Sequence, residues 1–240
     1  MNYNQSQFST PAFKGINRIL IVSCVVLFVL QSSLAPLFGV HLESYLGLSL
    51  PMLLRGHFYQ LISYPFMQFG LMGLIFNCLL FWLIGSELES LWGRRTYLEY
   101  LFSSVIGGAI SFLFLSEVFV GHAIVPLLGL NGLCSSLLVA YAVLFSERQL
   151  YFFMLFPLKA KYFCMIIIVI ELYMAFFSPG RAAAFGNLGS MLFGFGYLKL
   201  KSAYIRSKRE SRPKKSKSKA GLYLVKEDED EDSNGPKYWQ

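Results

Sequence analysis

Residues 70–91 read GLMGLIFNCLLFWLIGSELESL, an apolar run that ends in a short acidic stretch. A bilayer core about 30 Å thick is crossed by roughly 20 apolar residues in a helix, so this run has the length of a membrane span. Comparable runs lie on both sides of it. The sequence therefore predicts an all-α polytopic membrane protein, a six-transmembrane-helix bundle with spans at 19–38, 70–91, 97–119, 125–145, 162–177 and 182–198.

The composition also indicates a membrane protein. Of the 240 residues, 55% are hydrophobic and only 15% are charged, against about 25% charged residues in soluble domains. The net charge of +7 does not favour a nucleic-acid partner, because the basic residues lie in short connections and in the C-terminal segment. We predict packing roles for the cysteines, and neither a metal nor a cofactor, because each lies in an apolar run without metal-ligand spacing. The four are Cys24, Cys78, Cys134 and Cys164.

Basic residues indicate how the spans are oriented. They flank alternate connections, as Lys14 and Arg18, then Arg94 and Arg95, then Arg148, Lys159 and Lys161, and finally Lys199, Lys201 and Arg206. The intervening connections hold only Arg55 and Arg181. By the positive-inside rule, this pattern predicts that both termini are cytoplasmic. We therefore expect a cytoplasmic N-terminal segment at 1–18, a membrane domain at 19–198 and a cytoplasmic tail at 199–240.

Two segments outside the spans differ in character. The connection 39–69 is rich in apolar and aromatic residues, so we expect it to lie in the membrane interface instead of in water. Within the tail, 201–219 is basic and rich in serine, and 226–232 is nearly all acidic. Such a composition is typical of chains that do not fold on their own. We interpret the basic stretch as a topology determinant that also contacts anionic lipid headgroups, and a specific partner is the alternative.

Several short motifs follow one another in the predicted spans. They read MQFGLMGLIFN at 67–77, GSELESLWGRR at 85–95, GLNG at 129–132 and GNLGS at 186–190. Small residues spaced like this are common in membrane helices, so no single motif identifies a family. Together, in this order and spacing, they resemble the rhomboid intramembrane serine proteases over about residues 56–198. In that family a serine of the fourth helix is the nucleophile, a histidine of the sixth is its base, and a histidine and an asparagine of the second help to hold the oxyanion.

The resemblance implies that the catalytic positions have changed here. The nucleophilic serine becomes Asn131, the base histidine becomes Asn187 and the helix 2 histidine becomes Gly73. Asn77 keeps its identity, and Gln68 stands at an outer histidine position. Serine proteolysis needs a hydroxyl that is activated by a neighbouring base, and a carboxamide is neither. The resemblance therefore predicts a rhomboid pseudoprotease.

An active rhomboid-type serine endopeptidase with a non-standard nucleophile is the alternative. Ser135 and Ser136 lie on the predicted fourth helix and carry hydroxyls. The histidines of the chain, His41, His57 and His122, all fall in connections that the predicted topology places outside. The predicted last helix therefore contains no histidine base.

Small residues recur at every fourth position on two predicted helices. They are Gly132, Ser136 and Ala140 on one, and Gly186, Ser190 and Gly194 on the other. Residues four apart share a helix face, and such ladders allow membrane helices to approach closely, so we expect the two faces to pack together. Asn131 and Asn187 border the first rungs. We therefore expect a hydrogen bond between their amides.

Two interpretations of the polar residues within the spans are open. The asparagines either fasten helices to one another or line a water-accessible cavity that receives a membrane segment. Glu171 is a charged group within a span, and such groups mark function by default, although its carboxylate can also reach the outer interface. On the second interpretation, the candidate client-binding residues are Gln68, Asn77, Asn131, Glu171 and Asn187.

The leading prediction is a catalytically inactive rhomboid-like protein that binds transmembrane segments of client proteins. It would influence their stability, trafficking or assembly, as inactive relatives are thought to do. A transporter-like or purely structural membrane protein is the third interpretation. The compact six-span layout favours a bacterial inner membrane. The sequence predicts neither the identity of the client nor the oligomeric state.

Overall fold

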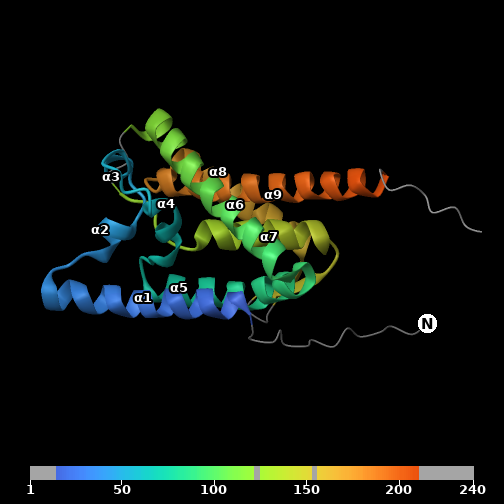
Figure 1. The fold of residues 1–240 in the computed structure, drawn as a ribbon, viewed down its shortest axis with the longest axis horizontal. Helices are drawn as coiled ribbons and strands as arrows, with labels where there is room; N and C mark the ends of the chain where they lie inside the picture. The colour runs from blue at the N-terminus through green and yellow to red at the C-terminus, as the bar shows by residue number, and fades with distance from the viewer. Residues whose placement is uncertain (1–14, 122–124, 153–155, 211–240) are drawn as a thin grey trace, which may run out of the picture. The chain divides into compact units, whose positions relative to one another are not determined.

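The fold is described from a computed structural model, which covers residues 15–121, 125–152 and 156–210 (Figure 1). The chain is almost entirely helical there, and the all-α prediction is confirmed. In chain order the elements are α1 (Ile16–Phe38), α2 (Leu42–Leu46), α3 (Leu50–Leu54), α4 (Gln60–Ser63), η1 (Tyr64–Phe66), α5 (Leu71–Leu80), η2 (Phe81–Gly85), α6 (Ser86–Val120), α7 (Asn131–Leu144), β1 (Gln149–Phe152), β2 (Phe156–Lys159), α8 (Ala160–Phe177) and α9 (Arg181–Glu210). The predicted tail from residue 211 on, residues 1–14 and His122 lie outside the described residues.

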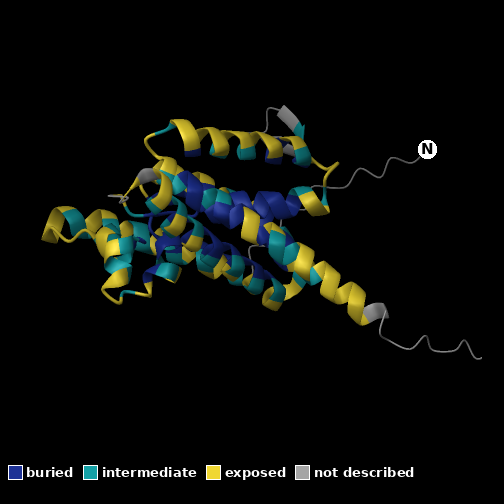
Figure 2. Ribbon diagram, turned by 90° about the horizontal axis from the view of Figure 1, so that it is seen from above, coloured by how far each residue is buried: buried dark blue, intermediate teal, exposed yellow. Residues whose placement is uncertain are grey.

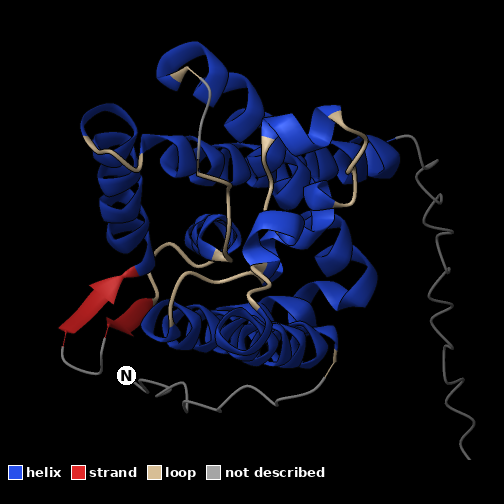
Figure 3. Ribbon diagram, turned by 90° about the vertical axis from the view of Figure 1, so that its left-hand side faces the viewer, coloured by secondary structure: helices blue, strands red, loops and turns tan. Residues whose placement is uncertain are grey.

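A short hairpin was not predicted. Strands β1 and β2 form a two-stranded antiparallel pair between α7 and α8, drawn in red in Figure 3, in which Gln149 pairs with Lys159. A lone two-stranded hairpin is only marginally stable. Here Lys159 Nζ donates a hydrogen bond of 2.8 Å to Glu147 Oε2, and Lys161 Nζ donates to Glu147 Oε1. These ion pairs fasten the base of the hairpin.

The helices support an integral membrane protein, whereas the figure of six spans stays a prediction. Within the described residues, three helical stretches are long and apolar enough to cross a membrane: Ile16–Phe38, Leu71–Phe119 and Ala160–Phe177. The second stretch contains two of the predicted spans. It is interrupted at Gly93, which has a φ of 78°. Residues with a side chain rarely adopt a φ in this region. The chain therefore turns between the predicted spans 70–91 and 97–119.

The fourth predicted span differs most from the observed helix. Helix α7 begins at Asn131 instead of residue 125, because residues 125–130 form bends and an isolated β-bridge instead of helix. There Leu127 exchanges backbone hydrogen bonds of 2.8 and 3.0 Å with Leu48, and Gly129 has a φ of 100°. Residues 132–141 are all buried, as the dark blue of Figure 2 shows, and α7 packs against α5, α6 and α8. Its 14 residues extend only about 21 Å, which an enclosed central helix tolerates.

Small residues bring α7, α9 and α6 close together. A Cβ on Gly132 would lie 2.7 Å from Ser190 Oγ, so the two helices touch where this glycine has no side chain. A Cβ on Gly194 would meet Ser136 Oγ and would lie 2.6 Å from the Tyr100 hydroxyl. The small residues of α7 and α9 thus face each other at two rungs. Their contact leaves space for hydroxyl hydrogen bonds to α6, such as the 2.6 Å bond from Tyr100 to the Ser136 carbonyl oxygen.

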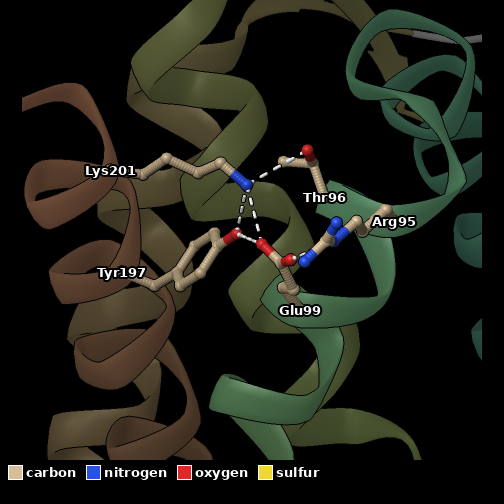
Figure 4. A network of polar contacts seen from close by, with 5 residues as sticks. All are labelled: Arg95, Thr96, Glu99, Tyr197 and Lys201. Carbon is tan, nitrogen blue, oxygen red and sulfur yellow. Dashed lines mark hydrogen bonds and ion pairs between the residues drawn. The ribbon is translucent and has the colours of Figure 1, made fainter. Parts of the chain in front are cut away.

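A network of charged and hydroxyl groups joins α6 to α9 (Figure 4). Lys201 Nζ donates to Glu99 Oε2 at 2.8 Å, to the Tyr197 hydroxyl at 2.7 Å and to Thr96 Oγ1 at 3.1 Å. Arg95 Nε donates to the other oxygen, Glu99 Oε1, at 3.1 Å. Both oxygens of the Glu99 carboxylate therefore have a cationic donor.

A second carboxylate on α6 holds the first turn of α1. The backbone N–H groups of Ile16 and Asn17 donate to Glu89 Oε1 and Oε2 at 2.8 and 3.0 Å, and the Glu89 side chain is buried. The first N–H groups of a helix lack partners within it, and the helix dipole favours an anion there. Nearby, Arg148 pairs with Glu87. We call the region formed by Glu87, Glu89, Glu99 and their partners the ion-pair end.

Candidate functional site

Asn77 is the centre of a cluster of amides. It lies on the buried side of α5, a helix that begins directly after Gly70. Its Nδ2 donates to Asn131 Oδ1 at 2.9 Å and to Gln68 Oε1 at 3.2 Å. An amide nitrogen has two hydrogens, so both are used. The first residue of α7 is thereby held against α5 at the level of the segment that precedes α5.

Gln68 connects this cluster to α1. Its Nε2 donates to the Pro65 carbonyl oxygen at 3.2 Å, and its backbone carbonyl oxygen accepts a 3.0 Å hydrogen bond from Gln31 Nε2. The Gln68 side chain is buried. We did not predict Gln31 as part of the site, because one glutamine within an apolar run carries no signal of its partner. The structure therefore extends the amide cluster from α7 through α5 to α1.

The Asn187 amide has a different partner from the one predicted. Its Nδ2 donates to Glu171 Oε1 at 3.0 Å and to Glu171 Oε2 at 3.2 Å, which joins α9 to α8. The predicted hydrogen bond between Asn131 and Asn187 is thus wrong for the described residues, where Asn131 bonds Asn77 instead. The reason is physical: a carboxylate is a stronger acceptor than a second amide, and Glu171 lies within reach of Asn187.

The amide cluster around Asn77 and the pair of Asn187 and Glu171 lie on either side of the contact between α7 and α9. Asn187 Oδ1 is 3.2 Å from the point that a Cβ on Gly132 would occupy, and Gly132 directly follows Asn131. Five polar side chains from the four helices and the segment before α5 therefore lie in sequence across the bundle. We call them the polar band, and they are Gln68, Asn77, Asn131, Asn187 and Glu171.

The members of the polar band differ in exposure. Gln68 and Asn77 are 3% and 5% exposed, whereas Asn187 and Glu171 are partly exposed and Asn131 is exposed. Asn131 is exposed although the next ten residues of α7 are all buried. Gly73, the remaining predicted site position, is exposed on α5, and a Cβ there would meet no atom within 4 Å. The structure therefore leaves Gly73 outside the band.

The polar band can exchange hydrogen bonds, and its five side chains are four amides and one carboxylate, without a hydroxyl or an imidazole. Ser136 is buried, and its hydroxyl lies 2.6 Å from the Tyr100 hydroxyl and 2.7 Å from Ser104 Oγ. The histidines within the described ranges, His41 and His57, are engaged elsewhere: His41 contacts Glu43, and the His57 ring contacts Tyr59. In the same ranges no three His, Cys, Asp or Glu side chains are grouped as a metal site would need.

The fold and the site define a helical integral membrane protein with a buried central helix and amides at its start. The family model of the rhomboid domain matches residues 55–204, more than half of the chain, and this range includes the whole polar band. The chain therefore belongs to the rhomboid family. It is 23% identical over 163 residues to Rhomboid-like protein 19 of Arabidopsis thaliana, which is 64% of this chain and 51% of that protein. The chain thus spans about half the length of this curated relative.

Proposed function

We propose that this chain is a catalytically inactive rhomboid that binds transmembrane segments of client proteins and influences their stability, trafficking or assembly. One observation carries the proposal: amides stand at the positions of the nucleophile and the base, and each is hydrogen-bonded to a neighbour. Asn131 accepts from Asn77, and Asn187 donates to Glu171. A carboxamide cannot attack a peptide carbonyl or take a proton from a nucleophile near neutral pH. What remains is a set of oriented hydrogen-bonding groups.

The exposure of Asn131 supports binding. Its Oδ1 is occupied by Asn77, whereas its Nδ2 has no hydrogen-bond partner among the described residues. An unsatisfied donor is disfavoured in lipid. A carbonyl or hydroxyl oxygen of an entering helix would satisfy it, and interhelical bonds of this kind contribute about 0.6 to 2 kcal/mol in membranes. The polar band then acts as a weak polar contact within a larger apolar interface.

The membrane orientation is part of the same proposal. We place both termini in the cytoplasm, because Arg94, Arg95 and Arg148 lie at the connections on that side and the opposite connections hold few basic residues. The basic stretch at 201–219 would then lie on the side of anionic lipid headgroups. The compact layout of the membrane domain favours the inner membrane of a bacterium.

A cleavage assay tests the loss of catalysis. Purified protein in proteoliposomes is given a generic transmembrane substrate, and the wild type is compared with the double variant Asn131→Ser and Asn187→His. We expect no product from the wild type and measurable product from the double variant, because the variant regains a hydroxyl and a base. Cleavage by the wild type would contradict the proposal and would favour the peptidase alternative, with Ser135, Ser136 and the histidines as the residues to test.

A crosslinking experiment tests client binding. A photo-crosslinking amino acid replaces Met72 on α5 or Met165 on α8, both of which are exposed on the helices next to the polar band. The matched control carries the crosslinker at Val26, which is exposed on α1. We expect single-pass membrane proteins to be captured from α5 or α8 more than from α1. Equal capture from all three positions would indicate random encounters in the bilayer and would argue against a specific site.

A further inference from the structure

Glu171 is a carboxylate without a cation. Within the described residues its hydrogen-bond partner is Asn187 alone, and no Lys, Arg or His lies within ion-pair distance. Three other glutamates show the contrast. Glu87 pairs with Arg148, Glu99 with Lys201, and Glu147 with Lys159 and Lys161. Among the described residues, Glu171 therefore lacks the basic partner that these three glutamates have.

The place of Glu171 on α8 directs it toward the bundle. The residues of α8 that are buried or partly buried recur with a helical period, as Phe163, Cys164, Ile167, Ile168, Glu171 and Ala175. Positions three and four apart form one face of a helix, so Glu171 shares the face that packs against the neighbouring helices. The side chain is nevertheless partly exposed. Its carboxylate thus lies at the edge of the contact between α8 and α9, where another helix can reach it.

The amide of Asn187 does not exhaust the hydrogen-bonding capacity of the carboxylate. An ionised carboxylate offers about four acceptor sites, and Asn187 supplies donors from one nitrogen only. A charged group in a membrane span is unfavourable unless a group of opposite charge accompanies it. A neutral amide provides hydrogen bonds but no compensating charge. The chemistry that complements this site is therefore a cation that enters from within the membrane.

We propose that Glu171 recognises client transmembrane segments that carry a lysine or an arginine within the span. The inference rests on the proposed function and names the class of client. A basic side chain in a membrane helix is itself unfavourable in lipid, so the ion pair relieves two unpaired charges at once. Asn187 acts as a positioning residue, because it fixes both carboxylate oxygens on the α9 side of α8.

Synthetic helices test the preference directly. Single-span reporters of leucine and alanine, with lysine, glutamine, leucine or glutamate at the central position, are incorporated into liposomes with the protein that carries the crosslinker at Met165. We expect the lysine reporter to be captured at least about tenfold more than the leucine reporter, the size expected for a close charge pair in low dielectric. The glutamine reporter separates charge from hydrogen bonding, and we expect it to stay near the leucine reporter.

Variants assign the preference to Glu171. Glu171→Gln keeps the shape and one acceptor and should reduce the ratio of lysine to leucine capture to about one, whereas Glu171→Lys should favour the glutamate reporter. Glu147→Gln is the matched control, because it removes a carboxylate that already has two lysine partners outside the band. Thermal unfolding confirms that each variant is folded. If Glu171→Gln does not fold, the comparison of the four reporters on the wild type still decides the question.

The outcomes separate this inference from the proposed function. Equal capture of the lysine and leucine reporters, or a lysine preference that survives Glu171→Gln, overturns the recognition of basic clients but leaves client binding intact. Capture of no reporter and of no cellular membrane protein overturns both. A lysine preference that is lost in Glu171→Gln and kept in Glu147→Gln supports both.

Discussion

The polar band and the ion-pair end hold their charges in different ways. They are well separated along α9: Asn187 and Lys201 are 14 positions apart, about 21 Å of helix. At the ion-pair end, Glu99 has two cationic partners and Glu87 has one. The band has four neutral amides and a single carboxylate, which bonds to the amide of Asn187, and no cation of the described residues pairs with it.

This difference suggests that the ion-pair end serves stability and the polar band serves binding. The carboxylates of the ion-pair end join α6 to the other helices: Glu89 accepts hydrogen bonds from the first turn of α1, and Glu99 pairs with Lys201 on α9. The band keeps a donor on Asn131 and acceptor capacity on Glu171 that the described residues do not use. We therefore expect changes at the ion-pair end to affect mainly stability. Changes in the band should affect mainly binding.

The largest effect on stability should come from Glu89→Ala. This change removes two charge-assisted hydrogen bonds from a buried carboxylate to the first turn of α1, and it leaves those N–H groups unpaired. We expect the free energy of unfolding to fall by about 3 kcal/mol, measured by thermal or denaturant unfolding in detergent. Glu147→Ala, at an exposed carboxylate, should lower the free energy of unfolding much less, because exposed ion pairs are screened by water. If the two variants are equally stable, the hydrogen bonds between Glu89 and the first turn of α1 do not contribute substantially to stability.

Gly194→Ala probes the seam between the two regions. A Cβ on Gly194 would meet Ser136 Oγ and would lie 2.8 Å from Ser104 Oγ, so α9 must move away from α6 and α7. Overpacking of this kind costs about 1–3 kcal/mol. Gly196→Ala is the matched control on the same helix, because a Cβ there would meet no atom within 4 Å. That variant should keep or raise the melting temperature, and a similar loss in both variants would mean that the close approach does not matter.

A double-mutant cycle tests how the band is connected. We expect Asn187→Ala and Glu171→Ala to couple by about 0.6–2 kcal/mol in the free energy of unfolding, the range for interhelical hydrogen bonds in membranes. Asn131→Ala and Asn187→Ala should be nearly additive, because these amides bond different partners. Strong coupling between the two asparagines would restore the contact that we predicted from the sequence and would contradict the arrangement described above.

The sequence predicted the helical class and the family, because these depend on long apolar runs and on spaced small residues. It did not predict the start of α7, where the positive φ of Gly129 and the bridge between Leu127 and Leu48 keep the chain out of the helix. A run of apolar residues reads the same in either conformation. The pairing of Asn187 with Glu171 was also missed, since the two residues are 16 positions apart and lie on separate helices. The side-chain partner then depends on helix rotation, which the sequence does not specify.

The smallest effect concerns the exposed ion pairs at the hairpin. The hydrogen bonds from Lys159 and Lys161 lower the pKa of Glu147 from 4.5 to about 2, and Lys159 has the larger effect. The folded state therefore holds its charge at lower pH than the unfolded state. The stabilisation is present above pH 4.5 and is lost as the pH falls toward 2.

The difference in melting temperature between the wild type and Glu147→Gln should accordingly shrink across that interval, and about 0.5 M salt should shrink it further because exposed charges are screened. A difference that does not change with pH would mean that Glu147 supports the hairpin by shape instead of charge. In that case the charge of the exposed Glu147 would contribute little to stability, in contrast to the charge of the buried Glu89, which accepts two hydrogen bonds from α1.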